Sequence, residues 1–151
     1  MTRKFLNLLN PVGLAVWWCD DGSIVGDGQQ GVLCMDNISK SEAEICKDYF
    51  HDVWNIDCSV AKVKSKKTPN KYYYRLYFSG ENCRKIVELV TPFIPIKSMI
   101  YKTFLRYNDF ELDLRWRSFL IKNYVPRFFN SARELEIFIK EHKDNRPKRL
   151  R

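Results

Sequence analysis

Residues 10–22 read NPVGLAVWWCDDG, and this stretch carries more information about the chain than any other. Asn10 and Pro11 are residue types that open a helix, as N-cap and first helical position. An apolar run follows and ends on two acids and a glycine. Packing does not require paired carboxylates there, whereas Asp20 and Asp21 at the edge of a buried element could hold a hard cation. We therefore predict a helix over Pro11–Asp21 with a candidate metal site at its end.

Two kinds of apolar periodicity, helical and strand-like, alternate along the chain after this helix. Apolar residues repeat with a period near 3.6 in the expected helices and with period 2 in the expected hairpins. The expected elements after the first helix are strands 22–25 and 31–35, a helix from a 39–42 capping box to 54, strands 59–64 and 72–78, and a helix over 81–90. This order predicts an α+β fold, with four antiparallel strands covered by helices on one face and free on the other.

The helix after the first hairpin has a predicted inward face. This face consists of Ala43, Cys46, Phe50 and Val53, which fall on one side of a helix.

Residues 13–22 resemble the motif helix of LAGLIDADG homing endonucleases, in the variant that reads Leu-Ala-x-Trp-x-x-Asp-Asp-Gly. Further segments look like later elements of that family in the right order: 31–34 with 39–42, 72–78, 91–95 and 99–102. The resemblance covers about residues 10–103. It implies an αββαββα core with a four-stranded antiparallel DNA-binding saddle, followed here by a C-terminal helical extension.

We divide the chain accordingly into three expected parts. These are a LAGLIDADG homing endonuclease-like domain over 1–103, a C-terminal extension packed on the core over 104–142, and a basic tail over 143–151.

The resemblance implies that Asp21, the acid directly before the motif glycine, binds the catalytic metal. Phosphodiester hydrolysis needs a metal to lower the pKa of the attacking water and to neutralise developing charge. Mg²⁺, or another divalent cation such as Mn²⁺, prefers carboxylate, phosphate and water oxygens. Asp20 is a second candidate ligand, with a surface or interface role as its alternative. A bound cation would also relieve the repulsion between these acids and the negative end of the helix dipole.

Lys102 corresponds to the lysine of the family's Tyr-Lys element, which points into the cleavage centre. In that position it would act as a catalytic residue, polarising water or stabilising charge on the phosphate. The alternative is a surface lysine after a Pro-rich turn.

The chain has one motif helix, whereas cutting both strands of a duplex needs two acidic centres. Single-motif members of the family pair their motif helices across a two-fold axis, so the resemblance implies a homodimer. The expected interface residues are Gly13, Ala15, Val16 and Asp20.

The second hairpin is strongly basic, because no Asp or Glu occurs between Cys58 and Gly80. Lysines alternate with small apolar residues on its first strand, and Tyr and Arg alternate with apolar residues on its second. We predict one basic, aromatic face that enters the major groove of double-stranded DNA; the alternative is a solubilising edge. The candidate contacts are Lys62, Lys64, Lys66, Lys67, Lys71, Tyr73, Arg75 and Tyr77.

The first hairpin offers three further candidates for contact with bases or phosphates. They are Ser23, Gln29 and Gln30, which are equally compatible with turn residues in water.

Composition favours a polyanionic partner, since the 151 residues have a formal net charge of +8. The five cysteines have no CxxC spacing and no nearby histidine partner, which disfavours a structural zinc site. Reduced core thiols fit an intracellular protein, including an organellar one if the chain is intron-encoded. No signal peptide and no apolar run of the ~20 residues needed to span a membrane is present.

The C-terminal third has weaker signals. Residues 110–117 fit both a strand and a helix, so their type stays open. Ser131 and Glu134 have capping-box spacing, and Leu135, Phe138, Ile139 and His142 form one helical face.

Three functions compete at this point. The first is a site-specific homodimeric DNA endonuclease dependent on magnesium. The second keeps the fold without cleavage, as an intron maturase or a stable component of an RNA–protein complex that binds structured RNA. The third is one half of a split two-motif enzyme.

Overall fold

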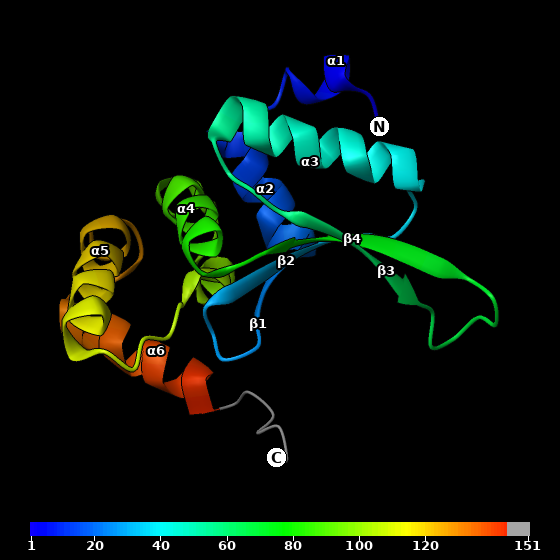
Figure 1. Cartoon of the computed structure of the whole chain (residues 1–151). Helices are drawn as coiled ribbons and strands as arrows, with labels where there is room; N and C mark the ends of the chain where they lie inside the picture. The colour runs from blue at the N-terminus through cyan, green and yellow to red at the C-terminus, as the bar shows by residue number, and fades with distance from the viewer. Residues whose placement is uncertain (145–151) are drawn as a thin grey trace.

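The computed structural model describes residues 1–144 and has the expected αββαββα core (Figure 1). A short helix α1 (Arg3–Leu6) precedes it. The core elements are α2 (Pro11–Asp21), β1 (Gly22–Val25), β2 (Gln30–Met35), α3 (Lys40–Trp54), β3 (Ser59–Lys64), β4 (Tyr72–Phe78) and α4 (Gly80–Val90). After the core come two 3₁₀ helices, η1 (Thr91–Phe93) and η2 (Lys97–Thr103), and the helices α5 (Phe110–Phe128) and α6 (Ala132–Asp144). The basic tail expected at the end of the chain lies, beyond Asp144, outside the described residues.

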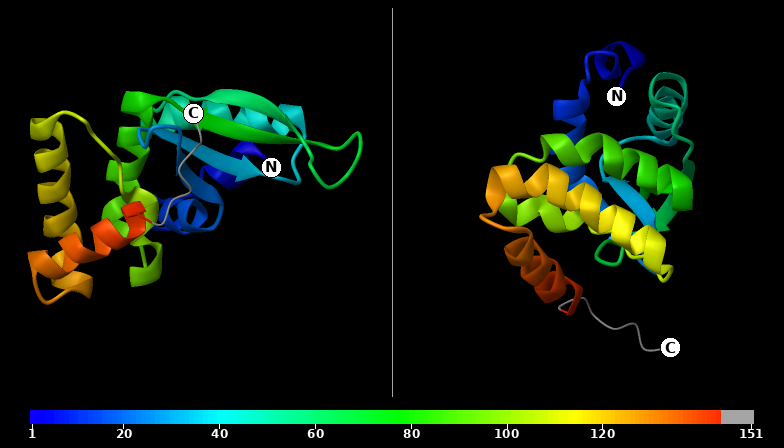
Figure 2. Two further views of the ribbon diagram at one scale, coloured as in Figure 1. Left: turned by 90° about the horizontal axis from the view of Figure 1, so that it is seen from below. Right: turned by 90° about the vertical axis from the view of Figure 1, so that its left-hand side faces the viewer.

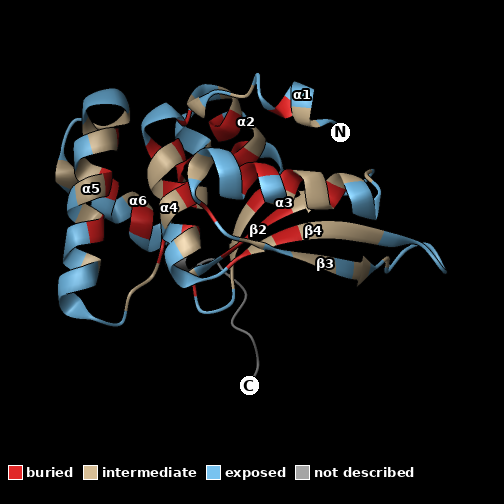
Figure 3. Ribbon diagram, turned by 45° about the horizontal axis from the view of Figure 1, so that its top comes forward, coloured by how far each residue is buried: buried red, intermediate tan, exposed pale blue. Residues whose placement is uncertain are grey.

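The four strands form one antiparallel sheet in the order β1-β2-β4-β3. Helices α2, α3 and α4 cover one face, and buried residues concentrate between these helices and the sheet (Figures 1 and 3). The β3–β4 hairpin extends past the helices. The predicted α+β architecture is therefore confirmed.

The side chain of Trp18 joins the end of α2 to the sheet. It is fully buried, lies edge-to-face with Phe78 at 6.4 Å between ring centroids, and donates from Nε1 to the Lys102 carbonyl at 3.0 Å. Gly22 and Gly31 make room for it, because a Cβ at Gly22 would lie 2.4 Å from the indole and one at Gly31 would lie 3.1 Å from it. Gly22 has an ordinary φ of −79°, so space, and not backbone conformation, requires glycine there.

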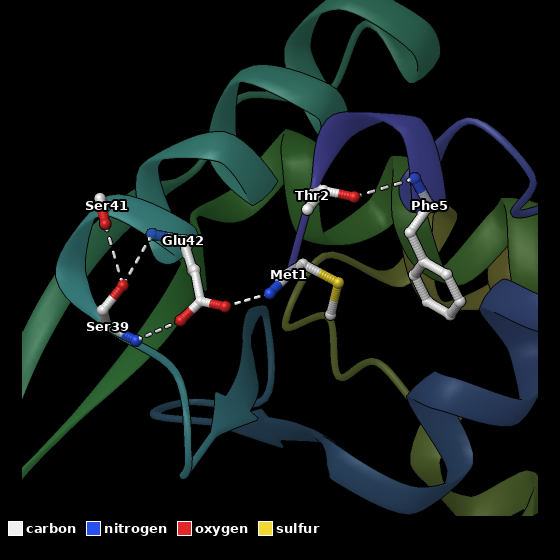
Figure 4. A network of polar contacts seen from close by, with 6 residues as sticks. All are labelled: Met1, Thr2, Phe5, Ser39, Ser41 and Glu42. Atoms are coloured by element: carbon white, nitrogen blue, oxygen red, sulfur yellow. Dashed lines mark hydrogen bonds and ion pairs between the residues drawn. The ribbon is translucent and has the colours of Figure 1, made fainter.

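Helix α3 begins with the predicted capping box. The Ser39 hydroxyl accepts from Glu42 N, and the Glu42 carboxylate accepts from Ser39 N (Figure 4). The ammonium of Met1 contacts the same carboxylate and, together with the capping-box hydrogen bonds, lowers the pKa of Glu42 to about 2. One predicted inward residue is wrong: Val53 is exposed, and Tyr49 is buried in its place beside Phe50.

All five cysteines are free thiols. Burial raises the pKa of Cys46 to about 11 and those of Cys58 and Cys83 to about 12. These groups are therefore protonated packing residues at neutral pH.

The C-terminal residues form two helices beside α4 at one end of the sheet (Figure 2). The open choice for 110–117 resolves as helix: the Asp109 carboxylate caps Leu112 N at 2.9 Å, and Trp116, Leu120 and Tyr124 are buried at helical spacing. Tyr124 bonds Thr103 Oγ1 at 2.7 Å, which ties α5 to η2. The hydrophobic core thus continues from the sheet layer into α5 and α6.

The packing of Gly22 yields a direct test. Gly22→Ala places a Cβ against the indole and the carbonyl of Trp18, so we expect a loss of about 1–3 kcal/mol or more in unfolding free energy, as for other overpacked cores. Gly80→Ala is the matched control, since a Cβ at Gly80 meets no atom within 4 Å. Urea unfolding monitored by tryptophan fluorescence measures both, and equal midpoints for Gly22→Ala and wild type would contradict this account.

Candidate functional site

Helix α2 delivers two carboxylates to the surface at the edge of the sheet. The Asn10 side chain caps its first turn by accepting from Gly13 N at 2.9 Å. At the other end Asp20 and Asp21 are exposed, and β1 starts directly afterwards with the buried Gly22. The pair therefore sits at the junction between helix and sheet.

A lysine from η2 provides the positive charge at this end of α2. Lys102 Nζ donates to the Cys19 carbonyl and to the Asp20 carbonyl, the latter at 3.3 Å. Because the last turn of α2 contains no basic residue, Lys102 compensates the negative end of the helix dipole. Lys102 thus lies beside the acidic pair, and its hydrogen bonds go to backbone carbonyls.

Charged side chains from α2, β4, η2 and the turn after β2 lie around Cys34 on β2. Burial raises the pKa of this thiol; Arg75 and Lys102 oppose the rise, whereas Asp36 and Asp21 add to it. Electrostatic effects weaken with distance, so the end of α2, η2 and the middle of β4 surround one region of the sheet. Arg75 lies directly opposite Cys34 in the β2–β4 register, and its Nε is buried without a hydrogen-bond partner.

The strand register defines which candidates share the sheet face that α2, α3 and α4 leave uncovered. Side chains of directly opposed residues project from the same face of an antiparallel sheet. Tyr77 opposes both Val32 and Ser59, Arg75 opposes Cys34 and Ala61, and Tyr73 opposes Val63. The open face therefore contains five of the predicted contacts, namely Ser23, Gln30, Tyr73, Arg75 and Tyr77.

The register corrects the prediction of one basic, aromatic face on the second hairpin. Lys62 opposes Tyr74, and Lys64 opposes Tyr72, which places both lysines on the face of Leu76, toward the helices. They remain exposed because this part of β3 extends past the helices, and Lys62 Nζ lies 4.1 Å from the centroid of the Tyr72 ring. The hairpin therefore carries positive charge on both faces.

Three further lysines lie at the exposed tip of this hairpin. They are Lys66, Lys67 and Lys71. The tip is ordered by its own hydrogen bonds: Ser65 N donates to the Lys71 carbonyl at 2.8 Å, and Asn70 adopts a left-handed conformation with φ 61°.

The two predicted glutamines of the first hairpin line two different hollows of the surface. Gln30 lines a small hollow with Ser59 and Tyr77 at the edge of the open face. Gln29 instead lines a groove of about 540 Å³ between α4 and α5. The structure therefore does not bring Gln29 together with the open-face residues.

The exposed stripe of α2 differs from the predicted dimer interface. Val16 and Asp20 are exposed as expected, but Ala15 is fully buried in the core of its own chain and cannot contribute to a surface. A Cβ at Gly13 would lie 2.9 Å from Leu9 Cδ1, so the space there is filled from within the chain. Val12 is also exposed and belongs to this stripe, although the predicted set does not include it. Its spacing of four residues from Val16 places both on one side of the helix and could have identified it.

The donor set at the end of α2 fits a magnesium ion that keeps part of its water shell. Within residues 1–144 no three side chains of the types His, Cys, Asp and Glu come together as a metal cluster. Mg²⁺ is commonly held by one or two carboxylates, with water and substrate phosphate completing its octahedron. Asp21 and Asp20 provide such a partial set.

No helix within residues 1–144 has both the length and the apolar composition that a membrane span requires.

Comparison with known proteins places these features in a family. The model of the LAGLIDADG DNA endonuclease family matches residues 1–86. The Protein RecA of Mycolicibacterium fallax is 28% identical over 146 residues, which cover 89% of this chain and 30% of that protein. The Probable intron-encoded DNA endonuclease 3 of Mycosarcoma maydis is 29% identical over 97 residues, or 64% of this chain and 65% of the relative. The chain thus spans about a third of the RecA relatives that it matches.

A solved structure shares the fold. It is the homing endonuclease I-WcaI bound to its DNA recognition sequence, with a TM-score of 0.60 and 22% sequence identity over 71% of this chain and 46% of that chain. The matched family model covers more than half of the sequence, including the whole of α2 with both acids and all four strands. The chain therefore belongs to the LAGLIDADG DNA endonuclease family.

Proposed function

We propose that this chain is a site-specific endonuclease that hydrolyses double-stranded DNA as a homodimer with Mg²⁺ or Mn²⁺. The observation that carries the proposal is the exposed Asp21 carboxylate at the end of α2, next to an uncovered sheet face with Arg75 at its centre. An acid at this junction can reach a phosphate that lies against the sheet.

Acidic and basic residues around the end of α2 would have different roles in cleavage. Asp21, with Asp20, would hold the divalent cation, which supplies a water of lowered pKa and a counter-charge for the phosphate. Lys102 orients the end of α2 through its carbonyl contacts and adds positive charge beside the acids. Arg75, at the centre of the open face, would turn its guanidinium toward a phosphate or a guanine edge.

The basic hairpin would bind the duplex on both of its faces. Tyr73, Arg75 and Tyr77 on the open face would lie toward the bases. Lys62 and Lys64, on the opposite face of the protruding hairpin, would contact the phosphate backbone beside the groove.

The homodimer is supported by the size of the structural match. This chain aligns with 46% of the DNA-bound I-WcaI chain, so two copies of the present fold would be needed to equal it. The exposed stripe Val12, Val16 and Asp20 on α2 is the surface that a two-fold axis would pair, with both acidic ends brought to one place.

Removal of the proposed metal ligand tests cleavage. Asp21→Asn is expected to abolish cutting of the target duplex, selected beforehand from a randomised library, because a neutral amide no longer supplies the anionic ligand. Duplex binding measured in calcium should survive. Asp48→Asn, an exposed acid on α3, is the control and should cut as wild type does. Wild-type cutting by Asp21→Asn would refute the assignment, and wild-type binding without any cuts would favour the RNA-binding alternative.

The mass of the protein–duplex complex tests the homodimer. Light scattering is expected to give two protomers per target duplex. Val16→Glu should reduce the number of protomers per duplex to one, because it buries a charge in the proposed interface between the two α2 helices. A one-to-one wild-type complex that cuts both strands would exclude the homodimer.

The salt dependence of binding tests the hairpin tip. Each phosphate that a lysine neutralises contributes about −0.9 to the slope of log K against log salt for B-form DNA. The triple variant Lys66→Ala, Lys67→Ala, Lys71→Ala should flatten that slope by up to about 0.9 for each phosphate that is no longer neutralised. The control is a second triple variant that also removes three positive charges, from exposed positions on α5 and α6: Lys122→Ala, Arg133→Ala, Lys140→Ala. Equal slopes for the two triple variants would show that the tip is only a solvated surface.

A further inference from the structure

The N-terminal segment presents an apolar surface that its own chain does not cover. We call this surface the N-terminal patch: Phe5 and Leu8, with an adjoining hollow of about 340 Å³ lined by Met1, Phe5, Leu6, Leu8, Leu9 and Trp17. Leu8 is 80% exposed and Phe5 65% exposed, which makes Leu8 the most exposed large apolar side chain among the described residues.

The patch is held in place by contacts on the other side of the same segment. Leu6 is buried in the core, and the Arg3 guanidinium pairs with Asp52 at 2.9 Å. The Thr2 hydroxyl caps the segment by accepting from Phe5 N, and the Met1 ammonium contacts Glu42 (Figure 4). These contacts fix α1 against α3, so Phe5 and Leu8 are displayed by an ordered element.

The patch is continuous with the exposed stripe of α2. Leu9, which lines the hollow, also lies against Gly13 of α2, directly after the exposed Val12. Trp17, which lines the hollow, is the neighbour of Val16 in α2. One apolar surface therefore runs from α1 along α2 toward the acidic pair.

The stripe on α2 alone is small for a stable interface. A standard interface buries about 800 Å² on each partner, from roughly 20–30 residues. Val12, Val16 and Asp20 cannot supply that area, and the protomers carry the same net charge, +8 each. Additional apolar contact is needed to offset this repulsion.

We infer that the N-terminal patch is the outer half of the homodimer interface and that its occupant is the same patch of a second copy. This inference rests on the proposed homodimer. A two-fold interface is self-complementary, so each protomer can contribute both the projecting Phe5 and Leu8 side chains and the hollow that receives them. The motif helices would then pair near the DNA, and the N-terminal segments would close the interface farther from it.

The test compares the same substitution at two equally exposed apolar residues. Leu8→Glu is expected to raise the dimer dissociation constant of the full chain, measured by sedimentation equilibrium without DNA, by about 100-fold. Each dimer loses two buried leucines, and burial of each corresponds to about tenfold or more. Phe110→Glu, at a residue 78% exposed on α5, should leave the constant unchanged. Thermal unfolding of both variants, followed by circular dichroism at a protein concentration at which the wild type is monomeric, should match wild type.

The outcomes separate the two proposals. A wild-type monomer, both free and on DNA, would overturn the homodimer itself. If Val16→Glu disrupts the dimer and Leu8→Glu does not, the homodimer stands and the N-terminal patch is not part of it. A large loss of thermal stability in Leu8→Glu with an unchanged dissociation constant would mean that the patch serves its own chain, which also overturns the inference. Leu8→Ser, which adds no charge, should weaken the dimer in the same direction.

Discussion

The burial of one indole at the end of α2 is the constraint on which the site depends. Trp18 fits between Gly22 and Gly31, packs against Phe78 and bonds the Lys102 carbonyl. These interactions fix the last turn of α2 to the first two strands and to η2 at once. The helix ends one turn after the indole, so the backbone of the exposed acids is held rigidly. A metal ligand needs such a rigid position.

The Lys102 side chain stabilises the end of α2 where the two acids lie. Its ammonium satisfies carbonyls that a helix end leaves without partners, and it offsets the negative end of the dipole where two carboxylates stand. The acids can therefore be kept close together at a helix C-terminus, an arrangement that would otherwise be unfavourable. Under the proposed function, a Lys102 substitution would affect cleavage both through this positioning role and through the lost positive charge.

The sequence was sufficient for the core elements from α2 to α4, but not for the type of residues 110–117 or for the relative register of the strands. The bounds of α2 could be predicted because Asn10 and Pro11 mark its start and Gly22 its end, and the capping box located α3. Period-2 alternation identifies two faces on each strand but does not say which face of β3 matches which face of β4. That depends on the geometry of the seven residues between them, and it moved Lys62 and Lys64 to the other side. Ala15 was misplaced because a small residue fits a helix–helix contact and a tight core equally well.

The β3–β4 hairpin beyond the helices has a consequence for how such a protein changes over time. Leu76 and Phe78 anchor β4 in the core, whereas the lysines toward the tip and Tyr72 are exposed. Substitutions at the tip leave the core packing intact, so they change what the hairpin touches at almost no cost in folding free energy. Under the proposed function, target recognition can thus change independently of the scaffold, while the close packing of Gly22 against the Trp18 indole restricts substitution at the end of α2.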